Sequence, residues 1–316
     1  MVEVHLSGVF PRSEQLIDAT RAAVRGNLPE AEVDRTLRQD IESLVSLQEE
    51  SNLDALVDGQ LNWQDLFRPF SQLLTGIDPE SLTRWFDNNT FYRKPIVVEK
   101  ISLKTSDLGQ YFRSDLLPKV SHKKAILPGP FTFAQLAENR AYSSFSDLVN
   151  DIARALQRIV AALQARGYEY FQFNEPSLCA PGRTQLELEI AKHAYETCAS
   201  GISGTSILQL YFGDASQVIE TILDYSVDSI GIDFYATSVD SLKEYDFNKA
   251  LACGCVDGRN SLLESPKELK TFVSRAREIL EPVDICLTPN CDLDFLPVTV
   301  AEKKLRLLGE AKRLVS

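Results

Sequence analysis

The chain of 316 residues lacks several features that mark particular classes of protein. It carries 33 Lys and Arg against 45 Asp and Glu, a net charge of −12, so it has no positive surplus with which to displace counterions from nucleic acid. Its apolar runs, such as residues 159–163, are far shorter than the roughly 20 residues that cross a bilayer. The sequence therefore predicts neither a nucleic-acid partner nor a membrane partner.

The amino terminus also lacks the pattern of a secretory signal. The acid Glu3 stands where such a signal carries basic residues, and no long apolar core follows it. The six cysteines show no spacing typical of a disulfide framework. We expect a cytoplasmic protein with reduced thiols.

Histidine is scarce, with three residues in all, and this limits the catalytic arrangements available. His5 lies inside a predicted strand, where a core histidine with satisfied nitrogens is expected, while His122 and His193 are poorly placed for a Ser-His-Asp triad. The first strand runs into residues 8–12, GVFPR, which is not a glycine-rich nucleotide loop. Neither a triad nor a nucleotide-binding loop is predicted.

Three thiols raise the question of a metal cluster. Cys253 and Cys255 lie two residues apart in one predicted strand, on the same face, and Cys291 closes a neighbouring strand. Residues so placed inside a strand more often fill a layer of a barrel, so this alternative is less favoured than a structural role.

Short apolar, β-branched segments alternate with amphipathic helical segments along almost the whole chain, which is typical of repeated βα units. Helical spacing is clear in residues 148–163, 269–280 and 300–315. The predicted strands are Val2–Ser7, Leu53–Val57, Lys124–Leu127, Tyr168–Phe173, Ser206–Tyr211, Ser229–Phe234, Ala250–Val256 and Asp284–Leu287. We therefore predict an α/β fold in which residues 1–316 form one (β/α)8 TIM barrel.

The irregular part of this barrel lies between its second and third strands. Residues 84–92 and 95–101 there predict a hairpin-like excursion inserted into the βα series. Long insertions in barrels occupy loops, and the loops at the carboxyl ends of the strands build the active face.

Polar residues cluster where the predicted strands end, and this is where barrels place their functional groups. Helix caps and turns would explain some of them, such as Asp214, Asn290 and Asp257, but a turn has little need of Glu175 or Arg259. The candidate catalytic residues are Glu175, Tyr211, Asp233 and Cys291. The candidate binding residues are Arg12, Asp58, Gln60, Arg84, Asp87, Asn174, Asp214, Asp257, Arg259 and Asn290.

Six segments at these strand ends resemble those of cobalamin-independent methionine synthase, a family of two face-to-face barrels, and more particularly its amino-terminal, non-catalytic barrel. They occur in family order along nearly the whole chain, and the WFD-x-N and VDGRN elements are specific in combination. The segments are residues 84–92, 127–133, 171–176, 211–214, 256–260 and 289–293.

The resemblance implies that this chain lacks a zinc site at the barrel mouth. In the family's catalytic barrel, His and Cys at the fifth strand, Glu at the sixth and Cys at the eighth hold a zinc ion that activates the homocysteine thiol. The corresponding residues here are Gln209 and Tyr211, then Asp233, then Cys291, which do not make a tetrahedral zinc site. The resemblance therefore implies no zinc.

The resemblance also bears on the two substrates of the family. Gln60 and Asn174 are neutral where the catalytic barrel places carboxylates for the homocysteine ammonium. Arg84 keeps a basic position that contacts the polyglutamate tail of folate in the amino-terminal barrel, but the basic cluster after the first strand is reduced to Arg12. Folate remains a candidate ligand, although the acidic net charge disfavours a polyanionic tail.

Three functions follow as hypotheses. The first is an accessory or substrate-binding component of a methyl-transfer system in methionine biosynthesis, working with a separate zinc-bearing catalytic barrel. The second is an autonomous methyltransferase that acts on a thiol or another small substrate without the usual zinc. The third and least favoured is a metal-free decarboxylase of the uroporphyrinogen type, whose substrate would need arginines such as Arg12, Arg84 and Arg259.

Overall fold

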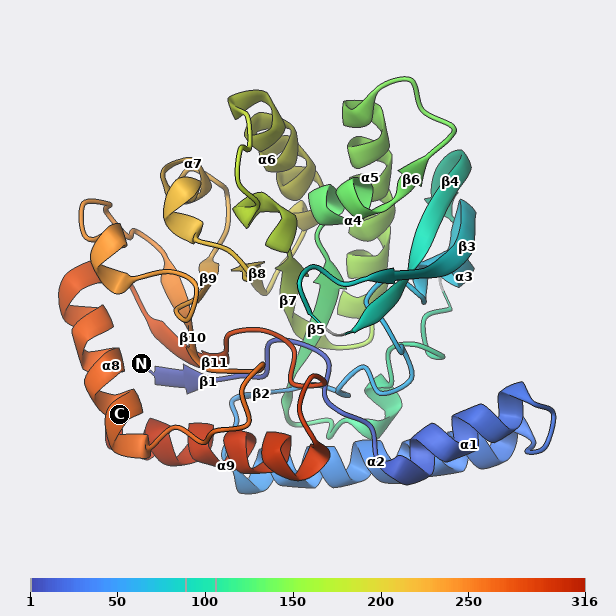
Figure 1. Cartoon of the computed structure of the whole chain (residues 1–316), viewed down its shortest axis with the longest axis horizontal. Coiled ribbons are helices and arrows are strands. Elements are labelled where there is room, and N and C mark those ends of the chain that lie inside the picture. Colours follow the sequence, from blue (N-terminus) through green and yellow to red (C-terminus); the bar gives the residue numbers. More distant parts are fainter. Residues whose placement is uncertain (1, 89, 106, 316) are drawn as a thin grey trace.

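Eight parallel strands form one curved sheet in the computed structural model, which describes residues 2–88, 90–105 and 107–315. The order of the strands is β1-β11-β10-β9-β8-β7-β5-β2 (Figure 1). Their bounds are β1 Val2–Val4, β2 Ala55–Leu56, β5 His122–Pro128, β7 Tyr168–Asn174, β8 Thr205–Leu210, β9 Ser229–Asp233, β10 Ala250–Val256 and β11 Ile285–Pro289. The predicted (β/α)8 barrel is confirmed.

The two edge strands, β1 and β2, meet through a few hydrogen bonds that bring the sheet close to a closed barrel. The Asp54 amide donates to the carbonyl oxygen of Val4 at 3.1 Å, and the Val4 amide donates to the Asp54 carboxylate at 2.7 Å. Further along, the Phe10 amide donates to the carbonyl oxygen of Gly59 at 3.0 Å. The strand ends on this side are therefore held beside those of the other strands.

The strand β2 is shorter than the predicted Leu53–Val57 because a side chain takes over part of its pairing. The buried Gln48 donates its amide to the carbonyl oxygen of Val57 at 2.9 Å, and its Oε1 accepts from the Val57 amide at 3.0 Å. The strand β1 is also shorter than predicted, because it ends at Val4 and not at Ser7. The Ser7 hydroxyl donates instead to the carbonyl oxygen of Pro289 at 2.8 Å.

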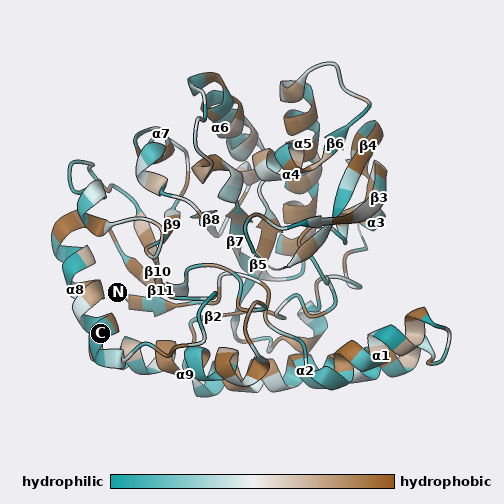
Figure 2. Ribbon diagram, viewed as in Figure 1, coloured by the Kyte–Doolittle hydropathy of each residue, from teal (hydrophilic) through white to brown (hydrophobic). Residues whose placement is uncertain are grey.

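The helices surround the sheet with their apolar faces turned inward, and Figure 2 shows hydrophilic and hydrophobic residues alternating along them. Their bounds are α1 Glu14–Val24, α2 Glu30–Glu50, α3 Phe70–Leu73, α4 Pro130–Leu136, α5 Phe145–Gln164, α6 Gln185–Ala199, α7 Ile219–Leu223, α8 Pro266–Leu280 and α9 Val298–Val315. In the described residues, four 3₁₀ turns cover Ser114–Leu116, Pro176–Cys179, Ala215–Gln217 and Val239–Leu242. The helices predicted at 148–163, 269–280 and 300–315 are present with slightly wider bounds. In the part of the chain that the structure describes, no helix is both long and apolar enough to cross a membrane.

The inserted excursion is a two-stranded antiparallel hairpin of β3, Leu74–Arg84, and β4, Phe91–Leu103, with the short β6, Glu138–Asn139, parallel to β4. It lies beside α4 and α5 (Figure 1). The Tyr142 hydroxyl accepts from the Ile101 amide at 2.7 Å and donates to Asp151 of α5 at 2.8 Å. These two hydrogen bonds fix the hairpin to α5. The predicted place of the hairpin between the second and third barrel strands is confirmed. Asn89, in the predicted segment 84–92, lies outside the described residues.

Candidate functional site

A cleft of about 670 Å³ opens between the tip of the hairpin and the loops that follow β7, β8 and β10. Phe86 from the hairpin and Phe212 after β8 form its apolar walls, with their ring centroids 5.4 Å apart. The guanidinium carbon of Arg259 lies 5.3 Å from the centre of the Phe212 ring, and Asp87 and Asp214 add carboxylates to the lining. The cleft therefore combines flat aromatic surface with charges of both signs, as small-molecule sites do.

The hairpin tip is held in place by buried aromatic packing. The Trp85 ring packs edge-on against Phe67 and Tyr92, with centroid distances of 5.7 Å and 5.5 Å. The Trp85 amide donates to the carbonyl oxygen of Thr90 at 2.9 Å and closes the turn. Phe86 follows with a positive φ of 48°. The anchored Trp85 and the left-handed backbone of Phe86 together place the Phe86 ring at the cleft.

Phe212 also has a left-handed backbone, with φ of 66°. A residue with a side chain pays roughly 1–2 kcal/mol for this conformation, which persists only where the surroundings fix it. Here the Phe212 amide donates to Oδ2 of Asp233 at 3.3 Å, and the Tyr211 ring packs against the Phe212 ring at 4.5 Å. The strain is thus balanced by contacts that hold the aromatic ring at the cleft.

Asp233 is fully buried at the end of β9 and connects three strand ends. Its Oδ1 accepts from the side-chain amide of Asn290 at 2.9 Å and from the Tyr235 amide at 3.0 Å. Asn290 in turn accepts from the Gly258 amide at 2.8 Å. An Arg259 nitrogen lies 3.9 Å from Oδ2 of Asp233. The buried carboxylate therefore partly compensates the charge of Arg259, which lines the cleft.

The turn after β10 is built so that only glycine fits its centre. A Cβ on Gly258 would lie 2.4 Å from the carbonyl oxygen of Asp292 and 2.9 Å from the Cys291 sulfur. Asp257 accepts from the Arg259 amide at 2.9 Å, while its own amide donates to Glu264 at 2.8 Å. This turn sets the position of Arg259 beside the cleft.

Glu175 joins the end of β7 to the start of α4. Its carboxylate accepts from the amides of Phe131 and Thr132 at 2.9 Å and 2.7 Å. A Cβ on Gly129 would lie 2.1–2.3 Å from Glu175 side-chain atoms, so this carboxylate needs glycine beside it. Burial raises the pKa of Glu175 to about 7, because loss of water outweighs these hydrogen bonds.

Tyr211, Asn174 and Cys291 are buried at the ends of β8, β7 and β11. Burial raises the pKa values of the Tyr211 hydroxyl and the Cys291 thiol well above their ordinary values. Oδ1 of Asn174 accepts from Nε2 of Gln172 at 2.7 Å. At neutral pH these strand ends therefore present neutral polar groups and a thiol rather than a thiolate.

Residues 74–281 match the family model described as the amino-terminal domain of cobalamin-independent synthase, and this match spans more than half of the chain. The chain belongs to the cobalamin-independent synthase family. The resemblance inferred from the strand-end segments is thereby confirmed.

Relatives of this synthase-family barrel match it along nearly its whole length. The methionine synthase of Saccharolobus solfataricus is 24% identical over 98% of this chain and 93% of that protein. The methionine synthase of Sulfurisphaera tokodaii is 23% identical over 98% of this chain and 90% of that protein. A solved B12-independent methionine synthase from Shewanella sp. W3-18-1, in complex with selenomethionine, shares the fold with a TM-score of 0.82, 17% identity and 99% and 97% coverage of the two chains.

The sequence-predicted residues of the synthase-family barrel fall into two groups. One group lines the cleft or lies within the hydrogen-bonded strand ends beside it: Asp87, Asn174, Glu175, Tyr211, Asp214, Asp233, Asp257, Arg259, Asn290 and Cys291. The other group, Arg12, Asp58, Gln60 and Arg84, is not among the described residues that line the cleft.

The second group is held in other contacts. Asp58 accepts from the Arg113 amide at 2.9 Å and from the Gln60 amide at 3.0 Å, and Gln60 donates to the carbonyl oxygen of Ile126 at 3.2 Å. Burial lowers the pKa of Arg12, which Asp294 partly offsets. Arg84 is exposed at the end of β3. The structure therefore does not bring these four residues into the cleft.

The residues at the family's zinc positions do not fit a zinc ion. The Asp233 carboxylate already accepts hydrogen bonds from Asn290 and from the Tyr235 amide. The positive charge of Arg259, 3.9 Å away, would oppose a metal ion there. Gln209 and Tyr211 supply no imidazole or thiolate, and Cys291 is the one thiol of the set. No three His, Cys, Asp or Glu side chains among the described residues converge at this end of the barrel.

The two aromatic walls of the cleft, Phe86 and Phe212, are not among the residues predicted from the sequence. Both lie inside segments that carried the family resemblance, directly beside Trp85 and Gly213. Their exposure to the cleft depends on left-handed backbone conformations that sequence patterns do not reveal. For Phe212, the available sequence signal was an aromatic residue directly before Gly-Asp at the end of a predicted strand.

Proposed function

We propose that this synthase-family barrel binds a small substrate of methyl transfer in its cleft and serves as an accessory, substrate-binding component of a methyl-transfer system. A separate zinc-bearing barrel would carry out the chemistry. The observation that carries this proposal is an aromatic, charged cleft beside strand ends whose carboxylates, Asp233 and Glu175, are held in hydrogen bonds within the protein.

The chemistry of the cleft fits the two kinds of molecule that this family's reaction joins. The adjoining rings of Phe86 and Phe212, tilted by 54° with their centroids 5.4 Å apart, offer an apolar surface on which a flat heterocycle such as a pterin packs. Arg259 suits a carboxylate, and Asp87 with Asp214 suits an ammonium group, so an amino acid would also be complementary. The Shewanella relative was solved with selenomethionine, which supports an amino acid as the first ligand to test.

Calorimetric titration of the purified chain with L-methionine, L-homocysteine, 5-methyltetrahydrofolate and methylcobalamin tests the binding part of the proposal. We expect saturable heat with the amino acid or the folate, and a loss of affinity of about tenfold or more in Arg259→Gln. Asn260→Ala, an exposed neighbour in the same loop, is the matched control and keeps wild-type affinity. No heat with any of these compounds would refute substrate binding.

Isolation of the chain from native extract tests the accessory part. The expected result is co-purification of a second barrel together with about one zinc ion for each complex. A chain that remains a monomer at every concentration, with no metal-bearing protein attached, would count against an accessory role.

Autonomous methyl transfer is the second candidate function. Relatives of nearly the same length are named methionine synthases, which favours a barrel that acts by itself. Under this alternative Asp233→Asn or Cys291→Ser abolishes turnover, whereas under the accessory proposal these substitutions change stability and ligand affinity only.

A further inference from the structure

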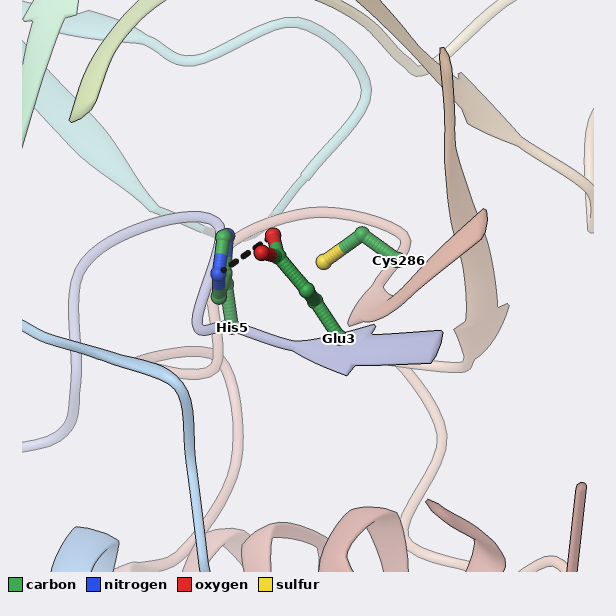
Figure 3. A group of neighbouring side chains, drawn as sticks. All are labelled: Glu3, His5 and Cys286. Atoms are coloured by element: carbon green, nitrogen blue, oxygen red, sulfur yellow. Dashed lines mark ion pairs between the residues drawn. The ribbon is translucent and has the colours of Figure 1, made fainter. Parts of the chain in front are cut away.

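The opposite end of the barrel, where the strands begin, brings together Glu3, His5 and Cys286 (Figure 3). Glu3 of β1 is paired in register with Cys286 of β11, and His5 follows Glu3 by two residues, on the same face of the chain. One carboxylate oxygen, one ring nitrogen and the sulfur all lie within 4.8 Å of one another. Within residues 2–88, 90–105 and 107–315, this is the one such group of three potential metal ligands.

His5 does not behave as the satisfied core histidine that the sequence predicts. Its side chain is 1% exposed, and Nδ1 has no hydrogen-bond partner. Nε2 lies 3.3 Å from Oε2 of Glu3, a contact without good hydrogen-bond geometry (Figure 3). Burial lowers the pKa of His5, which keeps the imidazole neutral. A neutral, buried and poorly partnered imidazole is in the state that binds metal ions.

We propose that Glu3, His5 and Cys286 form a binding site for a divalent transition-metal ion, for which Zn²⁺ is the best match. A mixed set of carboxylate oxygen, imidazole nitrogen and thiolate sulfur is typical of zinc sites. A tetrahedral zinc ion holds its ligand atoms about 3.5 Å apart, so movements of about 1 Å complete the geometry. Burial raises the pKa of the Cys286 thiol, so binding of the ion displaces the thiol proton. The resulting thiolate and the Glu3 carboxylate together match the charge of the ion.

The surroundings of these residues support this assignment. The Tyr170 hydroxyl donates to Oε1 of Glu3 at 3.1 Å, and its ring packs edge-on against the imidazole at 4.8 Å. Such outer contacts orient metal ligands and leave the second carboxylate oxygen facing the histidine. All three ligands line a cavity of about 530 Å³, which supplies a path of entry and room for a water as fourth ligand.

The buried Lys124 carries a charge of the same sign as the ion and acts electrostatically on both His5 and Cys286. Its ammonium is directed to the carbonyl oxygen of Leu6, to which it donates at 2.8 Å. The site lies on the first and last strands in chain order, which are neighbours in the sheet, so a bound ion would reinforce the pairing of β1 with β11.

Titration of the chelator-treated full chain with Co²⁺, followed by absorption spectroscopy, tests the proposal. We expect a cobalt–thiolate charge-transfer band that saturates at one ion per chain and disappears when Zn²⁺ displaces the cobalt. Cys286→Ser is expected to lose the band, and Glu3→Gln is expected to weaken binding by about tenfold or more. Because Zn²⁺ binds the folded state, it should also raise the thermal midpoint of the wild type but not of Cys286→Ser.

Cys291→Ser and Cys253→Ser are the matched thiol controls and keep the band. Urea unfolding of each variant verifies that it is folded before titration, and Glu3→Gln serves in place of Cys286→Ser if the latter does not fold. No band in the folded wild type, a band that survives in Cys286→Ser, or a band lost in Cys291→Ser would overturn the proposal.

Discussion

Asn290 donates its side-chain amide to Oδ1 of Asp233 at 2.9 Å, and its own Oδ1 accepts from the Gly258 amide at 2.8 Å. One fully buried side chain thus satisfies polar groups on β9 and on the loop after β10. Such an amide cannot be replaced by another small side chain without leaving a buried partner unsatisfied. The relationship explains how the strand ends beside the cleft are held in register.

Asn290→Ala is expected to lower the free energy of unfolding by about 1–3 kcal/mol, because both Asp233 and the Gly258 amide lose a partner without access to water. Urea unfolding measures the change. Asn260→Ala, which removes an exposed bond to the Leu262 amide, should cost much less and is the control. An equal cost for the two substitutions would contradict this account of the network.

The stability of the chain should fall with rising pH through the titration of Glu175. The pKa of Glu175 is raised from 4.5 to about 7 in the folded state, so the folded chain binds the proton more tightly than the unfolded chain. The free energy of unfolding therefore decreases between about pH 4.5 and pH 7, by up to about 3 kcal/mol, and then levels off. Other buried carboxyls such as Asp292, whose pKa is raised to about 6, titrate in both proteins, so the test is the difference between them. Urea unfolding should show that the free energy of unfolding of the wild type, relative to that of Glu175→Gln, decreases across this range. A difference between the two proteins that stays constant with pH would be the opposing result.

Gly129 and Glu175 should be energetically coupled. Gly129→Ala is expected to destabilise the wild type by several kcal/mol, because the new Cβ falls on the Glu175 side chain. In a Glu175→Ala background the same substitution should cost far less, which a double-mutant cycle measured by urea unfolding detects. Gly109→Ala, where a Cβ makes ordinary contacts at 3.4 Å and 3.5 Å, is the control. Strictly additive costs would show that the two residues do not compete for the space.

At Phe212, the glycine variant should be more stable than the alanine variant, which reverses their usual order of stability. Because its φ is 66°, Phe212→Gly is expected to be more stable than Phe212→Ala by about 1 kcal/mol, opposite to the usual effect of glycine. Both variants should lose ligand affinity, since both remove the ring from the cleft. Urea unfolding and calorimetry measure the two effects separately. A more stable alanine variant would mean that the left-handed backbone is not maintained in solution.

Much of the fold was predictable because it depends on local patterns. Apolar strands and amphipathic helices alternate in sequence, so the barrel followed from periodicity, and residues 84–92 and 95–101 between its second and third strands predicted the hairpin. Strand limits were less predictable. The shortness of β2 comes from Gln48, a helix residue whose bond to Val57 no strand pattern reveals.

The candidate site was predictable only in part. Asp233, Arg259 and Asp214 follow strand ends, and barrel architecture brings such residues together. Arg12 and Arg84 were expected near the same ligand, but their positions depend on loop paths rather than on strand register. The Glu3–His5–Cys286 group escaped notice because it needs the first and last strands to pair, which the sequence of either strand does not show.

Methionine formation from homocysteine and 5-methyltetrahydrofolate by the purified chain tests the central claim most directly. The account predicts no catalytic turnover by the chain alone, with or without added Zn²⁺, although the cleft binds a substrate; turnover appears when a zinc-bearing catalytic barrel is supplied. Multiple turnovers by the chain alone, abolished by Cys291→Ser in a variant that remains folded, would contradict it and identify an autonomous methyltransferase.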